Sequence, residues 1–304
     1  MTATADLVSL QRFVTTSGRS WEQVPVVDAA VLGLRPALNV CRARPAVLVR
    51  TAPGAGVAEL ARGLEGWRRT LLVAEDLGGP DELVSTVDPA DAVVRRWREP
   101  AVVLCLADGD AGLSRPWFAG GEPMPPPGGW ALPDDDFAHR DGMVATAEVR
   151  ALVLARLAPR PGVLVWDVGA GPGSVGVESA RLGAAVVAVD RDPVQCVRII
   201  ANASAYAVDV RVVEAELSAV FGDLPRPDAV FVGGGGVDVV KACATVGASR
   251  VVVATAELDR VVGARDALAA AGYTVDGCQL SSARLVGSGL VATNPATILW
   301  GTKK

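Results

Sequence analysis

An apolar strand that runs directly into three closely spaced glycines constrains the fold of this chain more than any other feature. Residues 163–168 are apolar except for Asp167, and Gly169, Gly171 and Gly173 follow before a helical pattern begins. Glycine lets a backbone turn sharply and approach a ligand closely. The free amides at the start of the following helix favour a negatively charged group. The segment therefore predicts a strand, a ligand-binding loop and a helix in succession.

An acidic residue at the end of the next predicted strand indicates the kind of ligand. Asp190 follows the apolar run 185–189 and lies twenty-one residues after Gly169, and a carboxylate in this place can accept hydrogen bonds from both hydroxyls of a ribose. A dinucleotide fingerprint would need glycine or alanine where Ser174 stands, and Pro172 suits a pyrophosphate cradle poorly. The spacing thus favours S-adenosylmethionine over NAD. Asp167 is predicted to be structural, bonded to loop amides below the cofactor.

The rest of the C-terminal half alternates between strand and helix patterns. Continuous apolar strands predict a parallel sheet covered on both faces, and two final strands with no helix between them predict a terminal hairpin with one antiparallel strand. The expected fold is a Rossmann-like α/β domain preceded by a smaller α/β domain. Helices are predicted at 146–157, 174–182, 193–205, 237–246 and 258–271, and strands at 163–168, 185–189, 210–213, 229–232, 250–254, 274–282 and 289–300.

Composition sets the domain organisation and excludes several function classes. The proline- and glycine-rich stretch 115–133 predicts a linker between residues 1–114 and 134–304. A net charge of −5 argues against nucleic acid as the main partner. Five scattered cysteines, the lack of a 20-residue apolar run and a polar N-terminus lead us to expect a cytoplasmic protein without a membrane span.

A single histidine, His139, limits the chemistry further. A Ser-His-Asp triad would have to use this one histidine, and a zinc site with several histidines cannot form here, so no metal is expected. The simpler interpretation of His139 is an ordinary surface or hinge residue. The alternative is a substrate contact or a proton donor near the mouth of the active site.

Beyond the glycine loop, a series of motifs resembles one family. The motifs follow one another as they do in the decarboxylating precorrin-6Y C5,15-methyltransferases, from about Asp134 to Gly301. They are Asp134–Phe137, Asp141-Gly142, Glu148–Arg150, Trp166–Gly171, Ala188–Pro193, Phe231–Gly236 and Asn294-Pro295. This resemblance implies S-adenosylmethionine-dependent methylation of carbon 15 of precorrin-6Y, loss of carbon dioxide from its ring C acetate, a role in cobalamin biosynthesis and a homotetramer.

The resemblance also implies individual site residues. Arg284 is a candidate partner for a substrate carboxylate, and a solvated arginine is the equal alternative. Glu216 is a candidate acceptor for the adenine amine. The residues expected to contact the cofactor are Ala145, Gly169, Ala170, Gly171, Pro172, Gly173, Asp190, Arg191, Glu216 and Gly233.

The N-terminal part resembles the second half of a tetrapyrrole methylase domain. Glu75–Glu82 is close to the Leu-Gly-Gly-Pro-Asp-Glu signature of that domain, and no Gly-x-Gly-Pro-Gly segment precedes Leu7. We therefore expect residues 1–114 to be a truncated remnant that binds no cofactor of its own.

Two departures from the family pattern leave alternatives open. Ala145 stands where the family usually has threonine, and Glu214–Glu216 stands where it often has Gly-Asp-Ala. A cofactor-binding but inactive scaffold of corrin synthesis is therefore one alternative to the active enzyme. A related methyltransferase with another substrate is a second.

Overall fold

The computed structural model divides the chain into two compact units, Met1–Pro126 and Pro127–Lys304. It describes residues 6–108, 129–139 and 144–303, so most of the predicted linker 115–133 and the Asp141-Gly142 motif lie outside the described residues. The end of that predicted linker belongs to the C-terminal unit. Leu132 is buried, and the amides of Ala131 and Leu132 donate to the Glu178 carboxylate. None of the described helices is long and apolar enough to cross a membrane.

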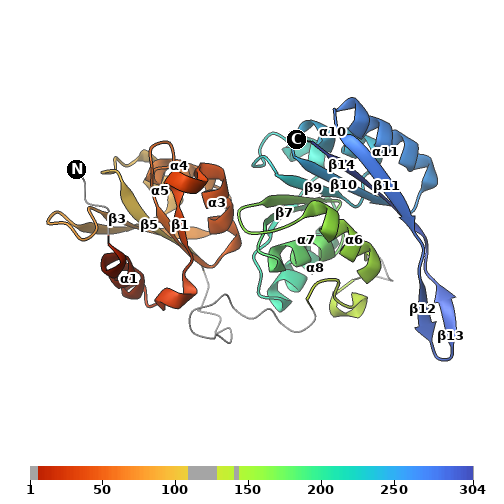
Figure 1. Ribbon diagram of the computed structural model, residues 1–304, viewed down its shortest axis with the longest axis horizontal. Coiled ribbons are helices and arrows are strands. Elements are labelled where there is room, and N and C mark those ends of the chain that lie inside the picture. The colour runs from red at the N-terminus through yellow and green to blue at the C-terminus, as the bar shows by residue number, and fades with distance from the viewer. Residues whose placement is uncertain (1–5, 109–128, 140–143, 304) are drawn as a thin grey trace. The chain divides into compact units, whose positions relative to one another are not determined.

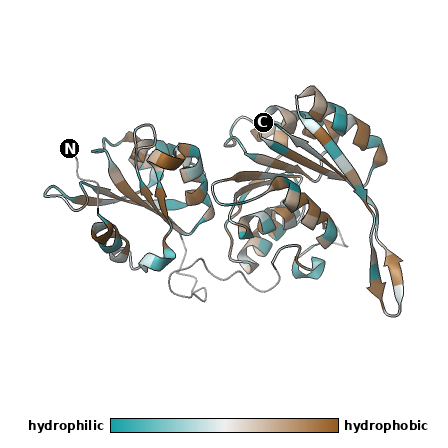
Figure 2. Ribbon diagram, in the orientation of Figure 1, coloured by the Kyte–Doolittle hydropathy of each residue, from teal (hydrophilic) through white to brown (hydrophobic). Residues whose placement is uncertain are grey.

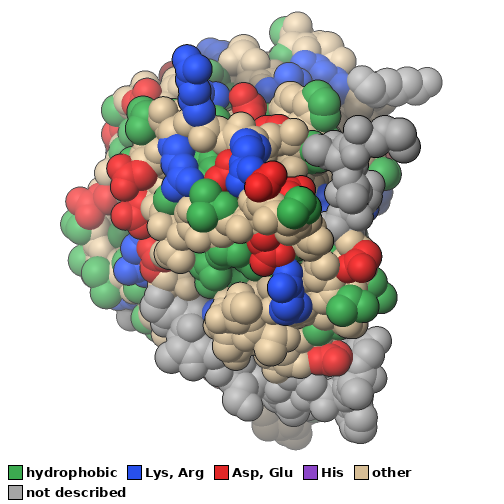
Figure 3. Space-filling view, turned by 90° about the vertical axis from the view of Figure 1, so that its left-hand side faces the viewer, with side chains coloured by type: hydrophobic (Ala, Val, Ile, Leu, Met, Phe, Trp, Pro, Cys, Tyr) green, Lys and Arg blue, Asp and Glu red, His purple; other side chains and the backbone are tan. Residues whose placement is uncertain are grey.

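The N-terminal unit is built on a five-stranded sheet in the order β1-β2-β5-β3-β4 (Figure 1). Only β1 and β2 pair in parallel, and the other neighbours are antiparallel. Figure 3 shows a face of this unit on which acidic and basic side chains are interspersed with apolar ones. The strands are β1 (Val26–Asp28), β2 (Ala46–Arg50), β3 (Arg69–Glu75), β4 (Leu83–Val87) and β5 (Ala101–Ala107), and the helices are α1 (Leu7–Thr16), α2 (Ala29–Leu32), α3 (Leu34–Ala43), α4 (Val57–Gly63) and α5 (Pro89–Val94).

The C-terminal unit has a seven-stranded sheet in the order β11-β14-β10-β9-β6-β7-β8, which confirms the predicted Rossmann-like fold (Figure 1). Pairing is parallel except where β14 meets its two neighbours. The strands are β6 (Leu164–Val168), β7 (Ala185–Asp190), β8 (Arg211–Glu214), β9 (Ala229–Val232), β10 (Arg250–Thr255), β11 (Thr274–Leu280) and β14 (Ala296–Thr302).

Helices cover both faces of this sheet, with α6, α7 and α8 on one face and α10 and α11 on the other (Figure 1). Every residue of β6 is buried, as its pattern, apolar except for Asp167, predicts, and the apolar strands run through the middle of the unit in Figure 2. The Thr146 hydroxyl caps α6 by accepting from the Val149 amide. The helices are α6 (Ala147–Leu157), α7 (Ser174–Arg181), α8 (Pro193–Ala205), α9 (Leu217–Val220), α10 (Gly236–Thr245) and α11 (Leu258–Ala270).

The end of the chain differs from the expected pair of strands. The strand predicted at 289–300 is interrupted at Thr293–Pro295, and the segment before the break pairs with β12 (Ala283–Val286) as β13 (Gly289–Ala292). Proline has no amide hydrogen to donate to a sheet, which accounts for a break at Pro295. The result is a two-stranded ribbon that projects from the sheet (Figure 1). Its base is joined by a 2.7 Å hydrogen bond between the hydroxyls of Ser282 and Thr293.

Candidate active site

The predicted glycine loop follows β6 and meets the loop that follows β9. Gly169 has a φ of +63°, and a Cβ placed on it would lie 2.7 Å from the backbone nitrogen of Gly234. A side chain at this position would therefore force the two loops apart. Gly171 and Gly173 also have positive φ values, of +55° and +77°. Only glycine adopts such a run of backbone conformations without strain, so the loop requires all three glycines.

A cavity of about 870 Å³ opens beside this loop, at the carboxyl ends of the parallel strands. Its wall includes nine of the ten residues that the sequence predicts as cofactor contacts; Gly173 is the exception, and lies behind the loop against Ile199. The far side of the cavity comes from the ends of β9 and β10 and the start of β14. The residues on that side are Gly233–Gly235, Thr255, Ala256 and Asn294–Ala296.

The Asp190 carboxylate lies at the edge of this cavity, held by two backbone amides. One oxygen accepts from Gly171 at 2.8 Å and the other from Asp192 at 2.9 Å. A carboxylate has about four acceptor positions, so each oxygen retains one for a ligand. The glycine loop thus orients the carboxylate that the sequence assigns to a ribose.

Glu216, predicted to accept from an adenine amine, forms an ion pair with another lining residue. Its Oε1 lies 2.9 Å from Nη1 of Arg191, and both side chains are exposed. The hydrogen bond to Glu216 raises the pKa of the Arg191 guanidinium. Solvent screens such an exposed pair, so a ligand can displace it.

Asp167 lies directly below the loop and is completely buried. One oxygen accepts from the Gly176 amide at 2.8 Å, and the other has no hydrogen-bond partner among the described residues. Burial raises the pKa of this carboxyl to about 7, because desolvation disfavours the charged form. Asp167 therefore binds the first turn of α7, whereas the sequence interpretation had it bind the loop amides.

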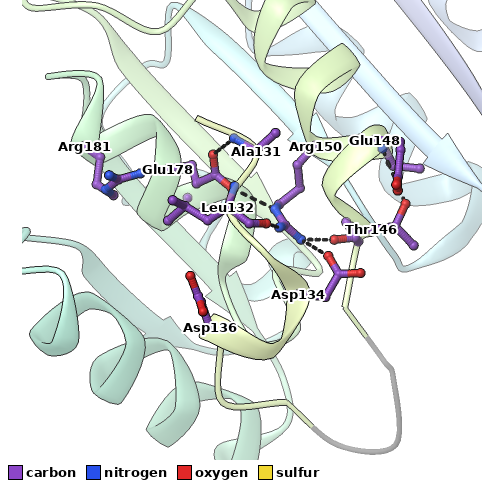
Figure 4. Close-up of polar contacts among 12 residues, drawn as sticks. Ala131, Leu132, Asp134, Asp136, Thr146, Glu148, Arg150, Glu178 and Arg181 are labelled. Carbon is purple, nitrogen blue, oxygen red and sulfur yellow. Dashed lines mark hydrogen bonds and ion pairs between the residues drawn. The ribbon is translucent and has the colours of Figure 1, made fainter. Parts of the chain in front are cut away.

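A buried ion-pair network supports the wall of the cavity (Figure 4). Arg150 is fully buried; its Nε lies 2.8 Å from Glu178, and Nη1 lies 3.0 Å from Asp134. The same guanidinium donates to the backbone carbonyls of Ala145 and Leu132. Since Ala145 lines the cavity, Arg150 fixes the position of that wall.

The two candidate substrate contacts lie outside the lining of the cavity. Arg284, on β12, forms ion pairs with Asp134 and with Glu148, the latter at 3.3 Å. His139 has a buried Nδ1 with no hydrogen-bond partner among the described residues. Neither side chain lines the cavity. No group of three or more potential metal-ligating side chains occurs in the described part of the chain.

Asn202 is a positioning residue that the sequence analysis missed. Its buried amide nitrogen donates to the Pro172 carbonyl at 2.8 Å, and its oxygen accepts from the Ala138 amide at 2.7 Å. It thereby joins α8 to the cofactor loop and to the segment before His139. A lone asparagine in a helix carries no local signal for such a role, because its partners lie 30 and 64 residues away.

Comparison with known proteins identifies the family. The model of the precorrin methyltransferase domain matches residues 135–303. A precorrin-6Y C(5,15)-methyltransferase (decarboxylating) from a Sinorhizobium species is 36% identical over 196 residues, covering 62% of this chain and 45% of that protein. A probable cobalt-precorrin-6B C(15)-methyltransferase (decarboxylating) from Pyrobaculum calidifontis is 34% identical over 182 residues, covering 55% of this chain and 93% of that protein.

A solved structure with a similar name also aligns with this chain. The crystal structure of a precorrin-6Y C5,15-methyltransferase from Geobacter metallireducens aligns with a TM-score of 0.55 and 29% identity, over 58% of this chain and 97% of that one. The chain spans about half the length of the Sinorhizobium relative. Because the family model matches more than half of the sequence, this chain belongs to the precorrin methyltransferase domain family.

Proposed function

We propose that the C-terminal unit transfers a methyl group from S-adenosylmethionine to carbon 15 of precorrin-6Y, with loss of carbon dioxide, as a step of cobalamin biosynthesis. The observation that carries the proposal is the cavity formed by the glycine loop and Asp190 within a precorrin methyltransferase domain. Relatives named for this decarboxylating methylation are 36% identical to this chain over 196 residues and 34% identical over 182 residues. The substrate assignment extends their names to this chain.

The lining residues suit the proposed cofactor. The loop Gly169–Gly173 leaves room for close approach, and Asp190 has acceptor positions for two ribose hydroxyls. Arg191 and Glu216 lie beside Asp190, where the adenine is expected. When bound, S-adenosylmethionine supplies an electrophilic methyl group. The contribution of the chain is to hold both reactants in line and apart from water, and such positioning lowers a barrier without an acid or base.

Product stoichiometry tests this function. The purified chain, incubated with precorrin-6Y and labelled S-adenosylmethionine, is expected to add one methyl group and release one carbon dioxide per substrate. No methyl group is expected at carbon 5. Mass spectrometry of the product and trapping of the gas measure both quantities. Two transfers per substrate would contradict the assignment of a single active domain.

A cofactor-binding scaffold is the second candidate. Ala145 brings no hydroxyl to the wall of the cavity, and Glu216 is paired with Arg191. Under this alternative, calorimetry detects S-adenosylmethionine binding while the assay detects no transfer.

We also propose that the chain assembles as a homo-oligomer, a tetramer by family resemblance, through the β12–β13 ribbon. Leu285 and Leu290 face each other across the ribbon, and each is 73% exposed. Val286 and Val291 are also exposed. A lone two-stranded ribbon is marginally stable in water, and clustered exposed apolar side chains favour an interface.

Light scattering tests this assembly. Replacing Leu285 and Leu290 with aspartate is expected to reduce the mass to that of the monomer, because charges cannot be buried unpaired in an apolar interface. Val94→Asp, which changes an exposed valine of the N-terminal unit, serves as the control and is expected to leave the mass unchanged. A monomeric wild-type protein would contradict the proposal.

For the N-terminal unit we propose a relation to the C-terminal lobe of tetrapyrrole methylases. The Leu77–Glu82 motif forms an ordered turn between β3 and β4, in which Asp76 accepts from the Asp81 amide and Glu82 from the Gly78 amide. A cytoplasmic location is also a proposal, supported by five cysteines that are all free thiols.

A further inference from the structure

We propose that a small cavity between α10 and α11 binds a carboxylate arm of the substrate, with Arg260 as its cation. The proposal rests on the proposed function. A substrate that loses carbon dioxide carries at least one carboxylate, here the ring C acetate that the family resemblance implies. Each arm kept in place during the reaction needs a site with an apolar wall for its methylenes and a cation for its charge.

The small cavity has both features. Its volume is about 150 Å³, well above the ~10–15 Å³ that a single water molecule needs, which suits a short carboxylate arm. Val240, Val253 and Ala264 form an apolar floor and are all at least 96% buried. Arg260, from the first turn of α11, supplies the one cation of its lining among the residues that the structure describes.

The small cavity shares a wall with the large one. Gly233, Gly234 and Ala254–Ala256 line both. These residues lie at the ends of β9 and β10, on the side of the large cavity away from Asp190. A substrate bound on that side of the large cavity can place an arm in the small cavity, beside these shared residues.

The distribution of charge favours Arg260 as the anchor. Asp190, Asp192 and Glu216 line the large cavity, where Arg191 is the one cation among the described lining residues. Arg191 is paired with Glu216 on the side proposed for the cofactor. On the side left for the substrate, Arg260 is therefore the one cation among the described lining residues of the two cavities. Without it, the acidic side chains of the large cavity would repel a substrate carboxylate.

The present partner of Arg260 leaves it able to bind a carboxylate. Its Nε lies 2.7 Å from a Glu257 oxygen, and the two side chains are 41% and 54% exposed. A solvent-screened pair of this kind is weak. Because Nε makes this contact, both terminal nitrogens remain for the two-pronged hydrogen bonding that guanidinium groups form with carboxylates. Glu257 competes with the substrate for the same cation.

Equilibrium binding of precorrin-6Y, measured by absorbance titration in the presence of S-adenosylhomocysteine, tests the proposal without requiring turnover. Arg260→Ala is expected to raise the Kd about tenfold, which corresponds to ~1.4 kcal/mol. Glu257→Gln is expected to lower the Kd by about twofold or more, because it removes the competing carboxylate. Arg265→Ala is the matched control, since Arg265 lies on the same helix, is 57% exposed and lines neither cavity.

Calorimetry with S-adenosylhomocysteine alone is expected to give the wild-type affinity in all three variants. A Kd for precorrin-6Y within twofold of wild type in Arg260→Ala would overturn the proposal, as would an equal loss in Arg265→Ala or a change in cofactor affinity. An inactive wild-type chain whose binding of precorrin-6Y depends on Arg260 would support the subsite and contradict the proposed activity. A wild-type chain that does not bind precorrin-6Y would overturn both.

Discussion

Replacing Arg150 with methionine is expected to destabilise the C-terminal unit by about 3–5 kcal/mol, because it leaves a buried carboxylate without its cation. Arg150 and Glu178 are both fully buried, and the contact between them is 2.8 Å long. The substitution also removes donors from the carbonyls of Ala145 and Leu132. Methionine fills much of the volume of arginine, so no large cavity is left. The loss of stability therefore measures the effect of breaking the ion-pair network.

Hydrogen exchange of peptides from β6 and α7 at increasing urea concentration measures this loss. A local probe is needed because a chain of two compact units does not necessarily unfold in one transition. Arg265→Met, at an exposed ion pair, is the control and is expected to change stability by no more than about 0.5 kcal/mol. The double variant with Glu178→Met is expected to lose less than the sum of the two single variants, because the fully buried Glu178 carboxylate is gone and Asp134 keeps its ion pair with Arg284. A loss below about 1 kcal/mol in the single Arg150 variant would show that the network is dispensable.

Asp190→Ala is expected to weaken S-adenosylmethionine binding by about 3–6 kcal/mol, or roughly 10²- to 10⁴-fold. The proposed ribose contacts are two hydrogen bonds to a charged acceptor, each worth about 1.5–3 kcal/mol. Isothermal titration calorimetry measures the change. Asp223→Ala, at an exposed position that does not line the cavity, is expected to bind like wild type. Unchanged affinity in the Asp190 variant would remove the ribose assignment.

Asp190→Asn separates the two roles of this carboxylate. The wild-type side chain also accepts from the amides of Gly171 and Asp192, so part of any loss arises from the loop. Asparagine keeps one oxygen that can accept from the Gly171 amide, and it loses the charge. If the ribose contacts dominate, the Asn variant stays well below wild-type affinity. If loop order dominates, the Asn variant recovers most of it.

Local features were readable from the sequence because their signals lie within a few residues of one another. The apolar run of β6 and the three glycines after it specify a strand and a turn with positive φ values. Thr146 and Asp192 begin helices because their side chains accept from amides two or three residues later. The position of Asp190 follows from the end of an apolar strand. The glycine loop and Asp190 were predicted from such local signals, whereas Ala145, Glu216 and Gly233 were predicted from the family resemblance.

Contacts between distant segments were decided only by the tertiary structure. The sequence alone does not tell that Gly169 needs to be glycine because Gly234 lies against it, or that Arg284 pairs with Asp134, 150 residues earlier. It also does not tell that β14 inserts between β10 and β11, or that the ribbon separates β11 from β14. A charged side chain looks the same in sequence whether it will meet solvent, a substrate or a buried partner. Its partner depends on which loops and helices the finished sheet brings together.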